Sequence, residues 1–201
     1  MKTITLDRTL PRVFVNERIP ASAVWLAETT FERGHTYLVE ATSGGGKSSM
    51  CAYIYGARTD YEGRILFDAD DTSRFSMDRW LELRRRNLAY LPQELSLFGE
   101  LSAIENIRLK NRLTGHATER QIEEWMERLG IASRRDHPAG RMSIGQQQRV
   151  AIIRSICQPF DFILLDEPVS HLDAENNRIA AELIGEEARR QGAGIISTSV
   201  G

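Results

Sequence analysis

The chain has 201 residues, and its 26 Lys and Arg side chains nearly balance 28 Asp and Glu, which leaves a formal net charge of -2. This balance gives no electrostatic support for binding nucleic acid or an anionic membrane over a broad face. The length suits a single domain, residues 1–201, with a substantial core. No apolar run in the sequence approaches the roughly 20 residues that span a bilayer.

The N-terminus and the two cysteines set further limits. The first residues alternate in polarity and include Asp7, Arg8 and Pro11, so we do not expect a signal peptide. Cys51 and Cys157 each lie in an apolar helical pattern, which predicts buried thiols in a reducing compartment and not a disulfide or a metal pair. Because the sequence has no apolar run long enough to span a bilayer, any association with a membrane should depend on another chain.

Residues 1–93 are predicted to form strands and turns around a glycine-rich segment. Short apolar runs bounded by glycine, proline or charged residues are typical of strands. Apolar residues at helical spacing predict one helix in this part of the chain. The predicted strands are Ile4–Leu6, Val13–Val15, Tyr37–Val39, Ile65–Phe67 and Leu88–Leu91, and the predicted helix is Met77–Arg86.

From residue 94 onward the pattern becomes helical and later alternates. Thr118 and Gln121 form a capping box ahead of an apolar helix face. The run Phe162–Leu165 predicts a buried strand, which is followed by a helix over about Glu175–Arg190 and a strand at Ile195–Ile196. Continuously apolar strands that alternate with helices predict an α/β fold whose mostly parallel sheet is covered on both faces.

The segment Glu40–Met50 reads Glu-Ala-Thr-Ser-Gly-Gly-Gly-Lys-Ser-Ser-Met and is predicted to bind phosphate. It lies between a strand and a helix, which is the context that a phosphate-binding loop needs. Glycines allow backbone N–H groups to face a polyphosphate, the helix that starts near Lys47 adds its positive end, and Ser48 offers a hydroxyl to Mg²⁺. A flexible Gly-Ser loop is the alternative, which the strand and helix context disfavours. The predicted cofactor-binding residues of the loop are Ser43, Gly44, Gly45, Gly46, Lys47, Ser48 and Ser49.

A phosphate loop needs an acidic partner for Mg²⁺, and Asp166 stands at the C-terminal end of the predicted buried strand. Glu167 follows it, where a carboxylate can polarise a water for attack on a terminal phosphate. A strand followed by two solvated acids is the alternative interpretation of this pair alone. We predict that Asp166 is a metal ligand and that Glu167 is the catalytic base.

Three further segments decide between these interpretations. Tyr90–Glu94 resembles the glutamine loop of ATP-binding cassette (ABC) proteins, Met142–Val150 resembles their signature motif, and Ser170–Asp173 resembles their D-loop. Met142 and Ile144 replace the usual Leu and Gly of the signature. Because all five elements occur in the family's order and spacing over nearly the whole chain, the chain resembles an ABC ATPase, the nucleotide-binding subunit of an ABC transporter.

The resemblance implies a P-loop NTPase (RecA-like) core formed by residues 1–93 and 159–201, with a mostly parallel sheet and an antiparallel β part at the N-terminus. Residues 94–158 would form an inserted α-helical subdomain that carries the signature. The implied cofactors are ATP and Mg²⁺. Two cassette subunits, identical in the simplest case, would pack head to tail around two ATP molecules. A separate permease would hold the subunit at the cytoplasmic, inner face of the cell membrane.

The resemblance also implies roles for individual residues. Ser143, Gly145 and Gln146 would reach the γ-phosphate held by the partner subunit, and the Ser143–Gln146 capping box begins a helix whose N-terminus attracts anions. Asp173 would couple the two ATP sites. The predicted metal ligands are Ser48, Gln93 and Asp166, and the predicted catalytic residues are Lys47, Gln93, Glu167 and Ser199.

Several positions depart from the family pattern or leave their role open. Ala41 replaces the first glycine of the phosphate loop, and Ser199 stands where the family places a histidine against the γ-phosphate. A serine hydroxyl is too short to contact both Glu167 and the γ-phosphate. This replacement should therefore affect the rate of hydrolysis and not the binding of nucleotide. Phe14 is predicted to stack on adenine, with Trp25 second, although such aromatic residues more often lie in a core. His171 is interpreted as facing solvent or the dimer partner.

Two alternative functions stay open. A soluble ABC ATPase of DNA repair or translation usually has a long coiled-coil insertion or two cassettes, and neither occurs in this sequence. An ATP-gated dimerisation switch with little turnover is favoured by Ser199 and opposed by the intact Glu167. Leu97 and Phe98, which follow the glutamine loop, are predicted to be exposed contacts for a permease. Burial in the helical subdomain is the alternative for both.

Overall fold

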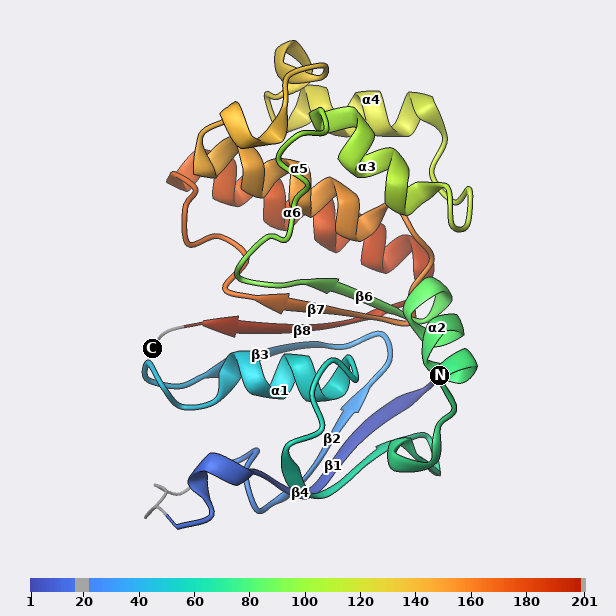
Figure 1. Ribbon diagram of the computed structural model, residues 1–201, viewed down its shortest axis with the longest axis vertical. Coiled ribbons are helices and arrows are strands. Elements are labelled where there is room, and N and C mark those ends of the chain that lie inside the picture. Colours follow the sequence, from blue (N-terminus) through green and yellow to red (C-terminus); the bar gives the residue numbers. More distant parts are fainter. Residues whose placement is uncertain (17–21, 200–201) are drawn as a thin grey trace.

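The computed structural model describes residues 1–16 and 22–199, which form two β-sheets and a layer of helices (Figure 1). The strands are β1 (Thr3–Pro11), β2 (Glu28–Glu32), β3 (Thr36–Glu40), β4 (Tyr61–Phe67), β5 (Asp70–Asp71), β6 (Leu88–Leu91), β7 (Phe162–Asp166) and β8 (Gly194–Ser199). The helices are α1 (Lys47–Ile54), α2 (Met77–Arg86), α3 (Ala103–Asn111), α4 (Glu119–Arg128), α5 (Ile144–Ile156) and α6 (Ala174–Gln191).

The N-terminal sheet has the order β2-β1-β4-β5 and is antiparallel. The prediction of a strand over Val13–Val15 is wrong, because Arg12–Phe14 forms a 3₁₀ helix directly after β1. Pro11 fixes its own φ and ends the strand. Val13 is 65% exposed and Val15 is 42% exposed, so neither side chain lies in a core of the described residues.

The second sheet is parallel throughout and has the order β3-β8-β7-β6. The predicted mostly parallel sheet with an antiparallel N-terminal part is therefore confirmed. The register pairs Asp166 with Thr198 and Glu40 with Ser199. Since all four strands run in one direction, the segments that follow β3, β6 and β7 leave the sheet at the same edge, and β8 ends there at Ser199.

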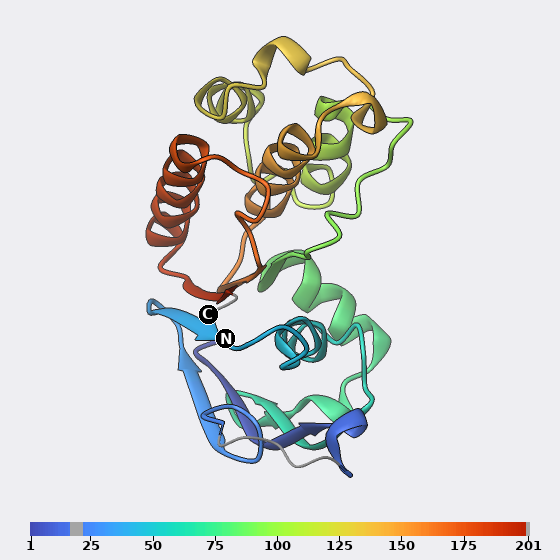
Figure 2. The same cartoon turned by 90° about the vertical axis from the view of Figure 1, so that its left-hand side faces the viewer.

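Strand β7 is buried on both faces, which explains why its sequence is apolar without interruption. Ile163 and Leu165 point into a core shared with α3, α4, α5 and α6. Phe162 and Leu164 point into a second core shared with α1 and the N-terminal sheet. Figure 2 shows α5 and α6 over one face of the parallel sheet and α1 on the other.

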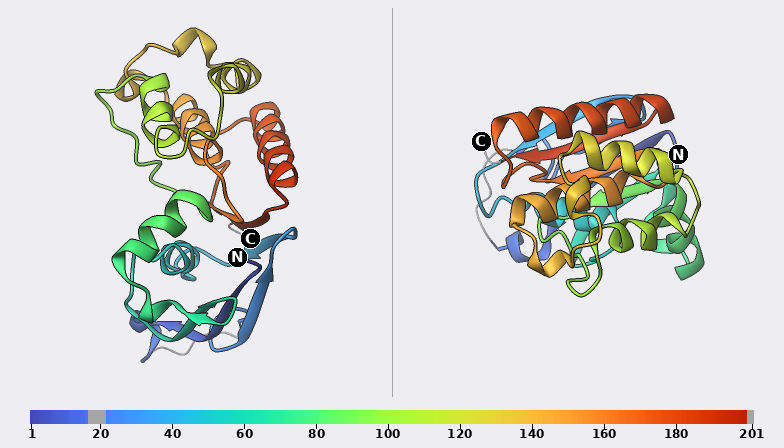
Figure 3. Two further views of the ribbon diagram at one scale, coloured as in Figure 1. Left: turned by 90° about the vertical axis from the view of Figure 1, so that its right-hand side faces the viewer. Right: turned by 90° about the horizontal axis from the view of Figure 1, so that it is seen from above.

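The helical layer is fixed by the caps that the sequence predicts. The side chains of Thr118 and Ser143 each accept a hydrogen bond from the backbone N–H three residues on, and the side chains of Gln121 and Gln146 each accept one from the N-cap N–H. A third capping box at Ser102 begins α3. These caps satisfy N–H groups in the first turns of α3, α4 and α5, which lie on the opposite side of the parallel sheet from the N-terminal sheet (Figure 3).

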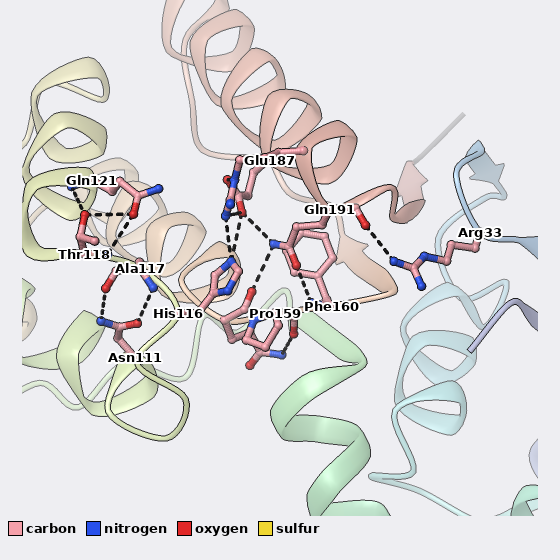
Figure 4. Close-up of polar contacts among 12 residues, drawn as sticks. Arg33, Asn111, His116, Ala117, Thr118, Gln121, Pro159, Phe160, Glu187 and Gln191 are labelled. Carbon is pink, nitrogen blue, oxygen red and sulfur yellow. Dashed lines mark hydrogen bonds and ion pairs between the residues drawn. The ribbon is translucent and has the colours of Figure 1, made fainter.

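The C-terminal end of α6 is tied to segments far away in the sequence (Figure 4). Glu187, 5% exposed, accepts a hydrogen bond of 2.7 Å from Gln191 Nε2, and its Oε1 lies 3.4 Å from His116 Nε2. Gln191 Oε1 accepts from the N–H of Phe160, 2.8 Å away, just before β7. Arg33, in the turn before β3, donates to the carbonyl of Gln191 at 2.8 Å. These contacts fix where α6 meets the sheet.

The segment between β6 and α3 is held by one buried side chain. Asn106 is 0% exposed. Its Oδ1 accepts from the N–H of Phe98 at 2.9 Å, and its Nδ2 donates to the carbonyl groups of Phe98, Leu101 and Ser102. The amide therefore replaces hydrogen bonds that this irregular backbone cannot make with itself.

Replacing Asn106 with Ala should lower the free energy of unfolding by about 3 kcal/mol, because several buried backbone groups lose their partner. Urea denaturation followed by circular dichroism measures this change. Asn177→Ala, in a half-buried position of α6, is the matched control and should cost about 0.5 kcal/mol or less. Equal stability of the two variants would show that the Asn106 network does not hold this segment.

Candidate functional site

The phosphate loop places a buried ammonium group at the edge of the parallel sheet. Lys47 is 6% exposed, and its Nζ donates to the carbonyl oxygen of Ala41 at 2.7 Å and to that of Thr42 at 3.3 Å. The same Nζ lies 3.7 Å from Glu167 Oε1. Burying a cation is costly unless polar groups surround it, and this one is surrounded by carbonyl groups and a carboxylate.

The backbone of the loop has the geometry that the glycines were predicted to allow. Gly44 and Gly46 have φ of 80° and 84°. Gly46 is the N-cap of α1. Within the described residues, the N–H groups of Gly44, Gly46, Lys47 and Ser48 make no hydrogen bond with a protein group. Together with the positive end of α1, they form a cradle that suits a polyphosphate.

Two aromatic rings pack against this loop. Trp25, 7% exposed, donates from Nε1 to the carbonyl oxygen of Gly45 at 2.9 Å. A Cβ added to Gly46 would lie 2.9 Å from Trp25 Cζ2 and 3.1 Å from Phe14 Cε2. Trp25 is therefore a buried support of the loop. Phe14, in the 3₁₀ helix after β1, is half-buried beside it.

The acidic pair at the end of β7 is held by a residue that sequence reasoning missed. Asp166 is 2% exposed, and its Oδ1 accepts a hydrogen bond of 2.9 Å from the hydroxyl of Thr198 on β8. The same hydroxyl accepts from the N–H of Glu167 at 3.1 Å. Glu167 has φ of 50°, a left-handed conformation that non-glycine residues adopt only when their surroundings hold them. The position of Thr198 at the end of a strand was the only signal in the sequence.

Gln93 and Ser199 lie at the same edge of the sheet. Gln93 Nε2 is 3.4 Å from Glu167 Oε2, so the segment after β6 reaches the acid after β7. Ser199 ends β8 opposite Glu40 and accepts from the N–H of Ala41 through its carbonyl at 3.4 Å. The structure thus brings Lys47, Gln93, Glu167 and Ser199 around one end of the sheet.

The signature residues lie elsewhere, at the N-terminus of α5. Ser143 is exposed, and no hydrogen bond or ion pair in the described part of the chain joins Ser143, Gly145 or Gln146 to the phosphate loop. Asp173 caps α6 by accepting from the N–H of Asn176 at 2.9 Å. This backbone contact and the Asn176 side chain lower the pKa of the Asp173 carboxyl. Both cysteines are buried and free, as predicted.

Two kinds of feature are absent from the described residues. In residues 1–16 and 22–199, no group of three or more His, Cys, Asp or Glu side chains could hold a metal ion. In the same residues, no helix is long and apolar enough to cross a membrane.

The family of the chain follows from comparison with known proteins. The sequence model of the ABC transporter family matches residues 27–170. The chain belongs to this family as an ATP-binding cassette. The match begins just before β2 and ends in the D-loop, so it includes the phosphate loop, the glutamine loop, the signature and the acidic pair.

Several relatives are similar to this cassette. It is 32% identical over 170 residues to the macrolide export ATP-binding/permease protein MacB of Shewanella sp. (strain ANA-3), over 82% of this chain and 25% of that protein. It is 30% identical over 167 residues to the lipoprotein-releasing system ATP-binding protein LolD of Shewanella sp. (strain MR-7), over 82% of this chain and 72% of that protein. The cassette therefore spans about a quarter of the length of MacB.

Solved structures show the same fold. The dimeric structure of MJ0796, a bacterial ABC transporter cassette, matches with a TM-score of 0.76 at 24% identity, over 98% of this chain and 87% of that chain. A bacterial Atm1-family ABC exporter with ATP bound matches with a TM-score of 0.79 at 22% identity, over 98% of this chain and 34% of that chain.

If Asp166 is a ligand of Mg²⁺, as the sequence predicts, Thr198→Val should weaken binding of MgATP about 10-fold, because residues that orient a metal ligand contribute this much to metal affinity. Binding of ATP in excess EDTA should not change. Isothermal titration with and without Mg²⁺ separates the two effects. Thr198→Ser keeps the hydroxyl and should behave like the wild type. Equal MgATP affinity of Thr198→Val and the wild type would mean that Thr198 does not orient Asp166.

Proposed function

We propose that this cassette hydrolyses MgATP as a dimer and thereby drives a membrane permease. The observation that carries the proposal is the meeting of Lys47, Gln93 and Glu167 at the end of the parallel sheet, with Lys47 Nζ 3.7 Å from Glu167 Oε1. A polyphosphate bound at the N-terminus of α1 would contact Lys47. Its terminal phosphate would then lie beside a carboxylate that can accept a proton from an attacking water, which is the role of Glu167.

The residues present fit Mg²⁺. The Asp166 carboxylate, the Ser48 hydroxyl and the Gln93 amide oxygen are hard oxygen ligands, which Mg²⁺ prefers. Thr198 orients the Asp166 carboxylate through its hydrogen bond. With so few protein ligands, the phosphates of the nucleotide would supply others, as is usual for this ion. When bound, Mg²⁺ would neutralise negative charge on the phosphates.

The second half of each ATP site would come from a partner subunit. Ser143 and Gly145 stand exposed or half-exposed at the N-terminus of α5, a helix end that attracts anions. In a head-to-tail dimer, they and Gln146 would approach the γ-phosphate on the partner, and Asp173 would link the two sites. Formation of a dimer is supported by the dimeric structures of MJ0796, one of which is bound to ADP and Pi. Phe14, half-buried beside Gly46, would stack on adenine.

Ser199 sets the rate in this proposal and supports a second candidate function. Because a serine hydroxyl cannot contact both Glu167 and the γ-phosphate as an imidazole would, turnover should be slow. An ATP-gated dimerisation switch with little turnover is the second candidate. A soluble ABC ATPase that acts without a permease is the third. The intact pair of Asp166 and Glu167 favours hydrolysis over the switch.

ATP turnover should rise more steeply than linearly with protein concentration, since the active species is a dimer. Glu167→Gln should lower kcat by about 100-fold or more, because a general base contributes this much. Ser199→His should raise kcat above the wild type. A phosphate-release assay over a range of protein concentrations measures all three. Tight MgATP binding with no turnover in the wild type, restored in Ser199→His, would support the switch instead.

A groove on the side of the cassette suits the permease. It has a volume of about 480 Å³ and lies between the segment after β6 and helix α3. Phe98, 57% exposed, Leu109, 42% exposed, and Leu113, 48% exposed, form apolar contacts around it. The predicted exposure of Phe98 is confirmed, whereas Leu97 is half-buried against the core below the helices.

The charge of this groove indicates which chemical groups a partner would need in order to bind there. Lys110 and Arg154 line it, and their hydrogen bonds go to backbone carbonyl groups: Lys110 to that of Arg84, Arg154 to those of Ser96 and Leu95. None of the described residues that line it is acidic. Burial lowers the pKa of Lys110, and the charges of Arg154 and Arg84 lower it further. A short permease helix with apolar residues and a carboxylate would satisfy these cations, and would hold the cassette at the cytoplasmic face of the membrane.

Lys110→Glu should abolish sedimentation of the cassette with inside-out membrane vesicles of its source organism, because the groove would then repel a carboxylate. Its ATP turnover in solution should stay within about two-fold of the wild type, since Lys110 does not contact the nucleotide. Arg120→Glu, on the exposed surface of α4, is the control and should still sediment. Binding that survives Lys110→Glu, or that persists on protease-treated vesicles, would rule out this groove.

A further inference from the structure

A buried glutamine connects α5 to the acidic end of β7. Gln148 is 1% exposed. Its Nε2 donates to the carbonyl oxygen of Pro168 at 2.5 Å, and its Oε1 accepts from the N–H of His171 at 3.1 Å. A carbonyl can only accept and an N–H can only donate, so the orientation of the amide is unambiguous. One side chain thus binds the backbone at two points of the loop 167–173, which we name the connecting loop.

The connecting loop begins with the proposed base. Glu167 directly precedes Pro168 and has φ of 50°. On its other side, its N–H donates to Thr198. The loop has few backbone hydrogen bonds of its own: the N–H of Ser170 is 3.4 Å from the carbonyl oxygen of Glu167, and the N–H of Leu172 donates to the carbonyl of Val169. Among its side chains, Ser170 Oγ lies 3.0 Å from His171 Nδ1. Thr198 and Gln148 therefore hold Glu167 from both sides, and only Gln148 belongs to the helical layer.

The first turn of α5 rests on the same loop. A Cβ added to Gly145 would lie 2.9 Å from the carbonyl oxygen of His171, so this helix turn and the loop are in direct backbone contact. Arg149 Nη1 donates to Asn176 Oδ1 at 3.1 Å, which joins α5 to the start of α6. A displacement of the first turn of α5 would consequently move the connecting loop.

We propose that Gln148 is a positioning residue that transmits the position of the α5 N-terminus to Glu167. The inference rests on the proposed dimeric hydrolase, in which Ser143 and Gly145 contact the nucleotide on the partner subunit. Nucleotide bound at the partner site would fix the first turn of α5, and Gln148 would fix Glu167 of the same chain. Each chain would then align its own base only when the partner site is filled.

Two variants and a matched control test this role. Gln148→Met keeps the shape of the side chain and removes both hydrogen bonds. Gln147→Met removes one hydrogen bond, from Nε2 to the carbonyl of Met142, in the neighbouring half-buried position. Gln148→Met should lower kcat about 100-fold, the effect of a misplaced catalytic group, and leave KM for MgATP within about two-fold. A kcat within about three-fold of Gln147→Met would overturn the proposal.

Gln148→Glu supplies a readout that a purely structural role would not change. The ionised carboxylate can accept from His171 but repels the carbonyl of Pro168. The protonated carboxyl can make both hydrogen bonds, and burial raises the pKa of such a group. The kcat of Gln148→Glu relative to the wild type should therefore increase as the pH falls from about 8 to about 6. The same ratio for Gln148→Met should stay constant. A flat ratio for both variants would contradict the proposal.

Amide hydrogen exchange separates failure of this inference from failure of the proposed function. If the wild type shows no turnover, the hydrolase proposal fails on that result alone. The His171 amide should still exchange about 10-fold faster in Gln148→Met than in the wild type or Gln147→Met, since it loses its acceptor. Unchanged exchange at His171 would refute the connection between α5 and the loop, whatever the turnover.

Discussion

The arrangement of the site depends on one hydroxyl group that lies between two parallel strands. Thr198 donates to Asp166 and accepts from the N–H of Glu167, so β8 fixes both acids at the end of β7. The register that pairs Asp166 with Thr198 places the hydroxyl at this point. Without the hydroxyl, the buried carboxylate of Asp166 and the partly buried N–H of Glu167 would lose a partner, which costs up to about 1–3 kcal/mol for each group.

The burial of β7 explains why the polar groups of the candidate site lie at the end of this strand. The side chains of Phe162–Leu165 pack into two cores on opposite faces, so the first polar side chain of the strand is Asp166, its last residue. Parallel neighbours place the phosphate loop, Gln93 and the acids at one edge. Lys47 is buried there among backbone carbonyl groups and Glu167, which compensates part of the cost of burying its charge.

Much of the fold and of the phosphate loop could be predicted from the sequence, because their signals are local. Each capping box joins residues that are three positions apart, and β7 is one apolar run. The phosphate-loop motif lies entirely within Glu40–Met50. Val13–Val15 was predicted wrongly as a strand because its apolar pattern says nothing about exposure. The roles assigned to Ser199, Ser143 and Phe14 stay predictions.

Thr198 and Gln148 could not be predicted as partners of the acidic loop. Thr198 is 32 residues from Asp166, and Gln148 is 20 residues from Pro168. Their contacts follow from the register of β7 with β8 and from how α5 packs, and no pattern within a short window contains that information. The support of the phosphate loop by Trp25 was missed for the same reason.

The most direct test of a site shared by two chains is the association state of Glu167→Gln in analytical ultracentrifugation. With saturating MgATP this variant should sediment as a dimer, because nucleotide is bound but not consumed, and without nucleotide it should sediment as a monomer. Adding Ser143→Arg to the same variant should abolish the dimer and leave MgATP binding to the phosphate loop intact. A Glu167→Gln protein that stays monomeric while saturated with MgATP would contradict the account.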